Sequence, residues 1–297
     1  MALLVGVAWA LACGPPEKVA EAPPAALPLS LSRPLRVVSL SRAASEFLLA
    51  LGAGDQIVAV DSGSSRIPAL SQLPVVDRVS ATRVEPDVIL LPESPAADQA
   101  RAEELRSAGY EVIVWAPHDF EEAFALCRDL GARLVGTPRA TAFETDLSRD
   151  LARIGGSSFG RPRPRVAGLI GPAPLAFAGG HSFITDLIEI AGASSVTHGG
   201  AELRISMSSD RLRGFAPDLL LVVSPDPLSE SERDAIQQAL PAAYRVEFFA
   251  FDAEHQWMHE AVAAARRLRA MIEPLSDELD RTRLPRAGPG QGGEGGG

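Results

Sequence analysis

Three features of the sequence predict an α/β fold. It has two doubly wound, Rossmann-like lobes with parallel sheets, joined by a long helical spine. Short apolar segments alternate with amphipathic segments of helical spacing, which is typical of parallel βαβ units. The same order of elements occurs twice along the chain. Between the two copies, residues 119–154 keep an apolar pattern with the period of a helix.

The clearest part of the repeat is a Pro-Asp pair followed by a continuous apolar run. Residues 84–91 (VEPDVILL) match residues 215–222 (FAPDLLLV). An uninterrupted apolar run suits a parallel strand that is buried on both faces. Each run is preceded by a predicted strand and helix, at 36–40 and 46–52 in the first half and at 165–170 and 182–192 in the second. Each is followed by a helix and a strand, at 99–108 and 111–115 and again at 231–240 and 245–251.

Between the halves, Gly136-Thr137-Pro138 interrupts the helical pattern, since proline disfavours helix in the residue before it. This predicts a helix, a turn and a long helix that holds the loops of the two lobes at a nearly fixed separation. We divide the chain into a signal peptide with a lipidation cysteine (1–13), a flexible tether (14–34), a first α/β lobe (35–118), linking helices (119–160), a second α/β lobe with a terminal helix (161–284) and a tail (285–297).

The N-terminal residues predict the compartment. Residues 2–12 form an apolar run that is too short to span a bilayer but suits a secretory signal. The run ends in a segment that resembles a lipobox, in which Cys13 is lipidated, and residues 14–34 are a Pro/Ala-rich tether. We therefore expect a lipoprotein of the periplasm or cell surface that contacts the membrane only through its lipid. The alternative is an apolar N-terminus without a signal function.

Composition excludes several classes of function. The formal net charge of −10 argues against a nucleic-acid partner, which requires a basic face. Two cysteines can form neither a disulfide framework nor a four-thiolate metal site, and Cys127 is expected to be a small buried residue of the spine. We expect no resident cofactor, and a monomer.

Three segments resemble the class III substrate-binding proteins of ABC importers, which take cobalamin, siderophores or haem. Residues 36–46 (RVVSLSRAASE) are similar to the family's opening strand and Ser-x-x-x-Thr-Glu turn. Residues 175–193 (LAFAGGHSFITDLIEIAGA) resemble its Gly-Ser-Phe-led helix, and residues 206–218 (SMSSDRLRGFAPD) its serine, acidic residue, helix and Pro-Asp. The resemblance covers residues 35–275. It implies capture of a metal chelate (corrinoid, siderophore or haem) between the lobes and delivery to an importer permease, which recognises the closed cleft.

Ligands of open α/β sheets bind in loops beyond the carboxyl ends of the strands, and two facing lobes would join these loops into one cleft. The candidate ligand-binding residues there are Ser41, Arg42, Asp61, Arg66, Glu93, Phe177, His181 and Trp257. Trp257 is suited to stacking on a planar ligand. His181 is either an axial ligand of the chelated metal or an ordinary polar residue at a helix start. Trp115 ends a predicted strand and is expected to be buried.

Two further histidines, His255 and His259, have the spacing that places both on one face of a helix. Such a pair can hold a transition metal. Gln256 occupies the place of the glutamate in the zinc-protease motif, so that chemistry is not predicted. Surface histidines without a ligand are the alternative.

The resemblance also implies that Asp210 docks in an arginine pocket of the permease. An acidic residue in the first turn of a helix is the simpler reading, and the two are compatible. The corresponding segment of the first half, residues 78–82 (RVSAT), has no acidic residue.

Two other functions stay open. An enzyme built on two Rossmann-like lobes is disfavoured, because the chain has no Gly-x-Gly-x-x-Gly fingerprint, P-loop or Gly-x-Ser-x-Gly elbow. A degenerate lipoprotein that keeps the fold for signalling or scaffolding is the second alternative.

Overall fold

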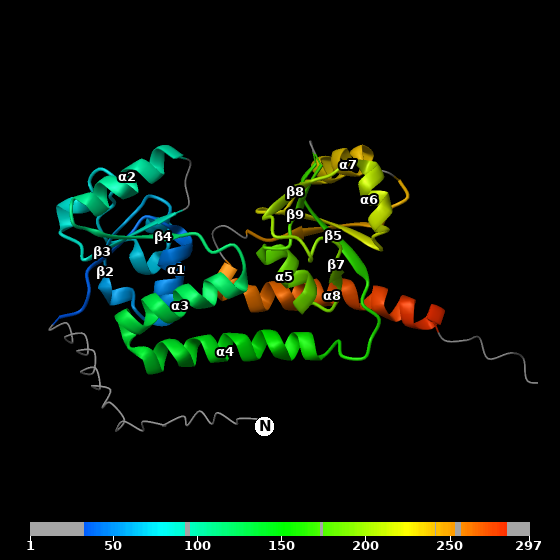
Figure 1. Ribbon diagram of the computed structural model, residues 1–297, viewed down its shortest axis with the longest axis horizontal. Coiled ribbons are helices and arrows are strands. Elements are labelled where there is room, and N and C mark those ends of the chain that lie inside the picture. The colour runs from blue at the N-terminus through cyan, green and yellow to red at the C-terminus, as the bar shows by residue number, and fades with distance from the viewer. Residues whose placement is uncertain (1–32, 93–95, 173–174, 241, 253–256, 284–297) are drawn as a thin grey trace, which may run out of the picture. The chain divides into compact units, whose positions relative to one another are not determined.

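The computed structural model describes residues 33–92, 96–172, 175–240, 242–252 and 257–283 (Figure 1). Residues from Pro34 onward form one compact unit. Its strands form two separate sheets, as the repeat predicts. The predicted signal peptide, the tether up to residue 32 and the tail from residue 284 lie outside the described residues.

The first sheet has four strands in the order β2-β1-β3-β4, and all its neighbours are parallel. The strands are β1 (Val37–Ser39), β2 (Ile57–Val60), β3 (Val88–Pro92) and β4 (Glu111–Trp115). Helix α1 (Arg42–Leu51) covers one face, and helix α2 (Ala96–Ser107) covers the other. The doubly wound prediction is confirmed here, and Trp115 is buried as expected. Strand β2 is an addition to the predicted elements.

The second sheet is mixed rather than wholly parallel, with the order β10-β9-β5-β6-β8. Its strands are β5 (Arg165–Pro172), β6 (Leu175–Ala178), β7 (Ser194–Ser195, paired with β5), β8 (Arg204–Ser206), β9 (Leu219–Ser224) and β10 (Val246–Ala250). Strands β5, β9 and β10 are parallel, whereas β6 is antiparallel to its neighbours. The reason is the connection from β5 to β6, which is too short for a parallel crossover. The helices of this lobe are α5 (Phe183–Ile190), α6 (Ser209–Phe215) and α7 (Glu230–Ala239).

The repeated Pro-Asp pair has the same structural role in both lobes. In the first lobe, the backbone N–H of Arg36 donates to the carboxylate of Asp87 (2.8 Å), and the N–H of Asp87 donates to the Arg36 carbonyl (2.8 Å). In the second lobe, Arg165 and Asp218 make the same two bonds, at 2.7 and 2.8 Å. Each aspartate thus fixes the start of one central strand beside the start of the next.

A strained residue precedes the Pro-Asp pair in each lobe. Glu85 and Ala216 have φ angles of 48° and 43°, and they are the only non-glycine residues with positive φ in the described ranges. The guanidinium Nε of Arg36 donates to the Glu85 carbonyl (3.2 Å), and that of Arg165 donates to the Phe215 carbonyl (3.0 Å). The arginine at the start of each lobe therefore holds the turn whose backbone is strained.

The segment between the lobes folds as predicted. Helix α3 (Phe120–Val135) begins at its N-cap Asp119, whose side chain accepts from the Glu122 N–H (2.9 Å). Gly136 forms the turn at φ 84°, and helix α4 (Thr137–Gly156) packs beside α3 (Figure 1). Cys127 is buried on α3 as expected, and burial raises the pKa of its thiol to about 12.

The C-terminal helix α8 (Trp257–Arg283) is a second connection between the lobes. It packs against α1 of the first lobe, α4 of the spine and α5 of the second lobe (Figure 1). One hydrophobic core consequently extends beneath both sheets, with Phe47 and Leu90 from the first lobe, Leu187 and Leu219 from the second, and Ile272 from α8. The residue boundaries given above for the lobes and the linking helices stay a prediction.

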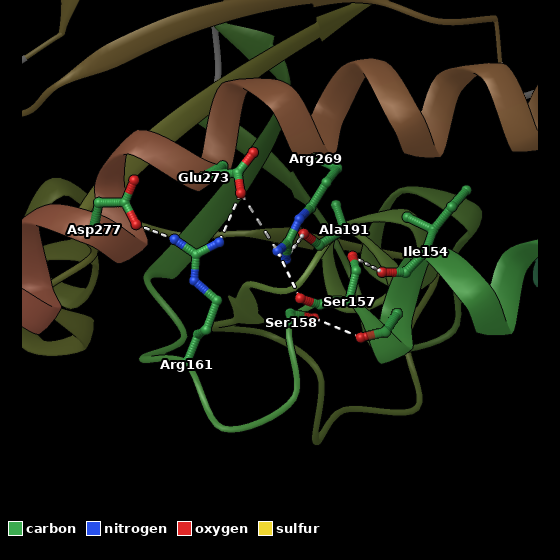
Figure 2. Close-up of polar contacts among 9 residues, drawn as sticks. Ile154, Ser157, Ser158, Arg161, Ala191, Arg269, Glu273 and Asp277 are labelled. Carbon is green, nitrogen blue, oxygen red and sulfur yellow. Dashed lines mark hydrogen bonds and ion pairs between the residues drawn. The ribbon is translucent and has the colours of Figure 1, made fainter.

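Arg269 of α8 joins the ends of two other helices (Figure 2). Its side chain is almost fully buried, with the residue 9% exposed. The guanidinium donates to the carbonyl of Ala191, the C-cap of α5 (3.3 Å), and to that of Ser157, the C-cap of α4 (3.2 Å). Carbonyls at helix C-termini lack partners within their own helix, and a cation there also opposes the negative end of the helix dipole.

A second arginine strengthens this joint. Arg161, in the connection from α4 to β5, bonds to Glu273 (2.7 Å) and Asp277 of α8 (Figure 2). Glu273 also lies 4.0 Å from the Arg269 guanidinium. The end of the spine is thus fixed to α8 by one buried and one more exposed arginine.

We predict that Arg269→Met lowers the free energy of unfolding by about 1–3 kcal/mol, because two carbonyls lose a charged donor in a buried position. Denaturant unfolding of the full-length protein measures the change. The matched control is Arg266→Met, at an exposed position of the same helix, where we expect less than about 0.5 kcal/mol. Equal effects of the two substitutions would show that Arg269 does not clamp the helix ends.

Candidate functional site

Two candidate residues of the first lobe lie at the start of α1. Ser41 is the N-cap, 6% exposed, and its hydroxyl accepts from the Ala44 N–H (3.3 Å). Arg42 is the first residue of the helix and forms an ion pair with Glu46 (2.9 Å). Ser41 therefore has a structural task in the fold, while the partly exposed Arg42 can also face a ligand.

Asp61 and Arg66 are the two ends of a tight loop after β2. The Asp61 carboxylate accepts from the N–H groups of Gly63 (3.1 Å) and Ser64 (2.9 Å). Ser64 begins the short 3-10 helix that ends at Arg66. The Arg66 side chain is exposed and forms no ion pair with any residue in the described part of the chain. The loop thus places a cation beyond the carboxyl edge of the first sheet.

The structure changes the prediction for residues 177–181. Because β6 is antiparallel to β5, its carboxyl end does not lie with the carboxyl ends of β5, β9 and β10. Phe177 is 0% exposed and packs in the core on the outer face of this sheet. Its ring cannot contact a ligand in this conformation, so we do not carry Phe177 into the proposal below.

His181, in contrast, contacts the segment that connects the first lobe to helix α3. Its Nδ1 lies 3.0 Å from Oδ2 of Asp119, the N-cap of α3, and its side chain is 54% exposed. The His181 N–H donates to the Glu202 carbonyl (3.3 Å), which holds the backbone in place. Bonding of Nδ1 to a carboxylate leaves Nε2 as the nitrogen that can meet a ligand, and no described residue bonds to Nε2.

The two glycines before His181 allow this approach. An added Cβ at Gly179 would lie 1.9 Å from the Glu202 carbonyl oxygen, and one at Gly180 would lie 1.8 Å from that of Gly200. Any side chain at either position would therefore push the loop away from residues 200–202, which precede β8. The glycines are required by close backbone packing, not by a ligand contact.

The helix starts of α3 and α5 cap each other beside this histidine. The Phe120 N–H of α3 donates to the carboxylate of Asp186 of α5 (2.9 Å), and the Phe183 N–H of α5 donates to the His118 carbonyl (2.8 Å). The rings of Phe120 and Phe183 meet edge to face at 5.2 Å. These contacts bind the start of the spine to the second lobe.

Asp186 lies in an unfavourable place for a charge. Burial is the largest cause that raises the pKa of its carboxyl, and the nearby Asp119 and Glu189 act in the same direction. The bond from the Phe120 N–H and the neighbouring His181 oppose this effect and lower the pKa. The net result is a pKa above the ordinary value.

Asp119, Asp186 and His118 were not among the sequence candidates. Asp119 is recognisable as an N-cap in the sequence, since an aspartate before a helix of this pattern is typical of one. Its contact with His181, 62 residues further along the chain, has no local signal.

Several candidates are not described by the structure. Cys13, Glu93 and His255 lie outside the described residues. The backbone of Trp257 and His259 is the first turn of α8, but their side chains are not described. Among the described residues, no group of three or more His, Cys, Asp or Glu side chains could hold a metal ion. Within the same ranges, no helix has the length and apolar character needed to cross a bilayer.

Asp210 lies in the first turn of α6, with its side chain 83% exposed and paired with Arg213. The first lobe has an exposed carboxylate in the equivalent region, one residue before the segment considered in the sequence. Asp77 accepts from the N–H groups of Val79 (3.0 Å) and Ser80 (2.8 Å). The bond from the Ser80 hydroxyl is the largest cause that lowers the pKa of Asp77, which keeps the carboxylate charged.

Comparison with known proteins agrees with this architecture. A model of the periplasmic binding protein family matches residues 37–247, from β1 into β10, and the chain belongs to this family. A curated relative, the "Cobalamin-binding protein" of Halobacterium salinarum, is 30% identical over an alignment of 251 residues, and the match covers 78% of this chain. The chain spans 64% of the length of that relative.

Solved structures share the fold. An ABC transporter substrate-binding protein of Listeria monocytogenes superposes with a TM-score of 0.67 at 18% identity, over 82% of this chain and 100% of that one. A periplasmic heme-binding protein of Pseudomonas aeruginosa gives 0.64 at 23%, over 82% and 94%. The periplasmic vitamin B12-binding protein of Vibrio cholerae gives 0.61 at 16%, over 80% and 96%. The two-lobed α/β fold with a helical spine is therefore that of class III binding proteins.

We predict that Asp186→Asn changes how stability depends on pH. An acid whose pKa is raised on folding holds its proton more tightly in the folded state, so stability is lost as pH rises through the interval between the two pKa values. Asparagine keeps an oxygen that can accept from the Phe120 N–H but carries no charge. The free energy of unfolding, measured from about pH 3 to about pH 7, should therefore shift in favour of the variant as pH rises.

The control is Asp55→Asn, at an exposed position in the first turn of a short 3-10 helix. A difference between Asp186→Asn and wild type that stays constant over this pH range would contradict the assignment.

Proposed function

We propose that the chain is an extracytoplasmic solute-binding protein that captures a metal chelate between its two lobes and presents it to an ABC importer. The ligand classes are those predicted from the sequence: a corrinoid, a siderophore complex or haem. We further propose that the protein is a monomer, is not an enzyme, and is held at the membrane by a lipid on Cys13.

The single observation that carries the proposal is the His181 imidazole. It is presented by the second lobe, oriented by Asp119 at the start of the spine, and exposed. A histidine whose second nitrogen bonds a carboxylate is a better metal ligand, because the carboxylate fixes the tautomer and raises the basicity of the ring. The names of the relatives support the class of ligand: cobalamin, heme and vitamin B12.

The remaining ligand contacts follow from the first lobe. We propose that Arg42, Asp61 and Arg66 face the ligand at the carboxyl edge of the first sheet. Glu93, Trp257, His255 and His259 stay predictions that rest on the sequence. A degenerate binding protein with a signalling or scaffolding role is the second candidate, and it predicts no ligand at all.

The test is a binding titration of the purified full-length protein with haemin, hydroxocobalamin and ferric desferrioxamine. We expect one probe to stabilise the protein against unfolding, by about 3 kcal/mol at one hundred times its Kd. If the probe is haemin or hydroxocobalamin, His181→Ala should lower its affinity at least about tenfold and change its absorption spectrum, because an axial nitrogen is lost. His198→Ala, at an exposed position of the same lobe, is the matched control.

Absence of stabilisation by any of the three probes would favour the degenerate alternative. A probe that binds equally well to wild type and His181→Ala would remove His181 from the site while leaving solute binding intact.

We propose in addition that Asp210 and Asp77 dock on cationic pockets of the permease, one from each lobe. We expect the double substitution Asp77→Asn with Asp210→Asn to leave ligand affinity unchanged and to lower importer-dependent uptake about tenfold or more, since charge pairs mainly steer association. Uptake of the radiolabelled probe in cells measures this. Asp234→Asn, on the exposed helix α7, is the control, and unimpaired uptake in the double variant would exclude both residues.

A further inference from the structure

Each lobe contains a chain of three buried hydroxyl groups beneath its candidate ligand loop. The first triad is Ser39, Ser45 and Ser64, and the second is Thr185, Ser195 and Thr197. All six residues are buried, and each hydroxyl bonds to at least one other member of its triad. Buried hydroxyls need such partners, because water cannot satisfy them.

The first triad connects three elements. The Ser45 hydroxyl, on α1, lies 2.8 Å from that of Ser39 at the end of β1 and 2.9 Å from that of Ser64. Ser39 in turn donates to the Ser41 carbonyl (3.1 Å). Since the Ser45 hydroxyl carries one proton, it can donate to only one of these two oxygens at a time.

Ser64 is the point at which this triad reaches the ligand loop. Its N–H is held by the Asp61 carboxylate (2.9 Å), and its carbonyl accepts from the Ile67 N–H (3.0 Å). Arg66 lies between these two anchors and is exposed. The backbone that leads to Arg66 is therefore held in part by the bond between the side chains of Ser45 and Ser64, which are both fully buried.

The second triad holds the loop that carries His181. Thr185, in the first turn of α5, donates to the Gly179 carbonyl (2.7 Å), and Thr197 donates to the Ala178 carbonyl (2.7 Å). The Ser195 hydroxyl lies between them, 3.4 Å from Thr185 and 3.0 Å from Thr197. The consecutive carbonyls of Ala178 and Gly179, at the end of β6, thus accept hydrogen bonds from two buried hydroxyls.

We infer that the two hydroxyl triads are positioning groups, which hold the Arg66 loop and the His181 loop in their ligand-binding arrangement before a ligand arrives. The inference rests on the proposed function for the identity of the ligand-facing residues. It adds the buried residues that hold the loops of these ligand-facing residues: Ser45 and Ser64 in the first lobe, Thr185 and Ser195 in the second. A loop held in advance loses less conformational entropy on binding, which raises affinity without a new contact.

The experiment combines amide hydrogen exchange with binding in the full-length protein. Ser45→Ala removes the central hydroxyl of the first triad, and Thr185→Val removes a hydroxyl of the second with little change in volume. The conservative variants Ser45→Thr and Thr185→Ser keep a hydroxyl. Ser276→Ala is the matched control, because Ser276 is buried and its hydroxyl has no hydrogen-bond partner within the described residues.

We expect Ser45→Ala to speed exchange of the amides at 63–67 by about tenfold or more, and Thr185→Val to do the same at 179–181, while the central strands keep wild-type protection. Affinity for whichever probe binds wild type, haemin or hydroxocobalamin, should fall about fivefold to fiftyfold in both variants. The conservative variants should restore most of both properties, and Ser276→Ala should change neither.

Three results would overturn the inference: unchanged exchange in the loops, faster exchange spread evenly over the lobe, or faster loop exchange with undiminished affinity. Should Thr185→Val fail to fold, Ser195→Ala tests the same triad from its middle member. If wild type binds no probe, the proposed function fails, and exchange alone decides whether the hydroxyls position the loops.

Discussion

The constraint on which the structure depends is that the two sheets share one core. One face of each sheet packs only against elements of its own lobe. The opposite faces of both sheets pack against a common set of helices: α1, α3, α4, α5 and α8. Apolar side chains such as Phe47, Leu187 and Ile272 belong to one continuous cluster. Separating the lobes would expose part of this cluster to water, at about 25 cal/mol for each Å² of apolar surface. The spacing between the lobes is therefore set by packing as well as by the spine.

Polar groups at helix ends fix the geometry that the core leaves adjustable. Arg269 caps the C-termini of α4 and α5, while Asp119 and Asp186 serve the N-terminus of α3. Hydrophobic contact is non-directional, whereas each of these bonds requires a particular distance and angle. A candidate ligand residue, His181, is attached to this network through Asp119. The same contacts that join the lobes thus orient a side chain of the proposed site.

The scaffold could be predicted from the sequence to the extent that its signals are local or repeated. The Pro-Asp pairs, the apolar runs after them and the Gly136 break all predicted elements that the structure contains. Strand β2 and strands β6 to β8 were missed, because each has only two to four residues. Strands β2 and β7 occupy equivalent places, each parallel to the first strand of its lobe, but their sequences share no pattern. The placement of Phe177 in a ligand loop was wrong for a related reason: the hairpin from β5 to β6 turns the ring into the core. Asp119 and His181 are 62 residues apart, and no two members of a hydroxyl triad share a helix or strand, so no periodicity predicts these contacts.

The two halves repeat their scaffold but place different chemistry at their loops. The first lobe presents the guanidinium of Arg66 on a loop fixed by Asp61, and the second presents an imidazole. A guanidinium favours an anionic group, and an imidazole favours a metal with an open coordination position. Haem through its propionates and cobalamin through the phosphodiester of its nucleotide loop can both offer an anionic group to Arg66. Within the proposed function, the pair Arg66 and His181 thus suits a metal chelate that carries an anionic group and leaves one coordination position open.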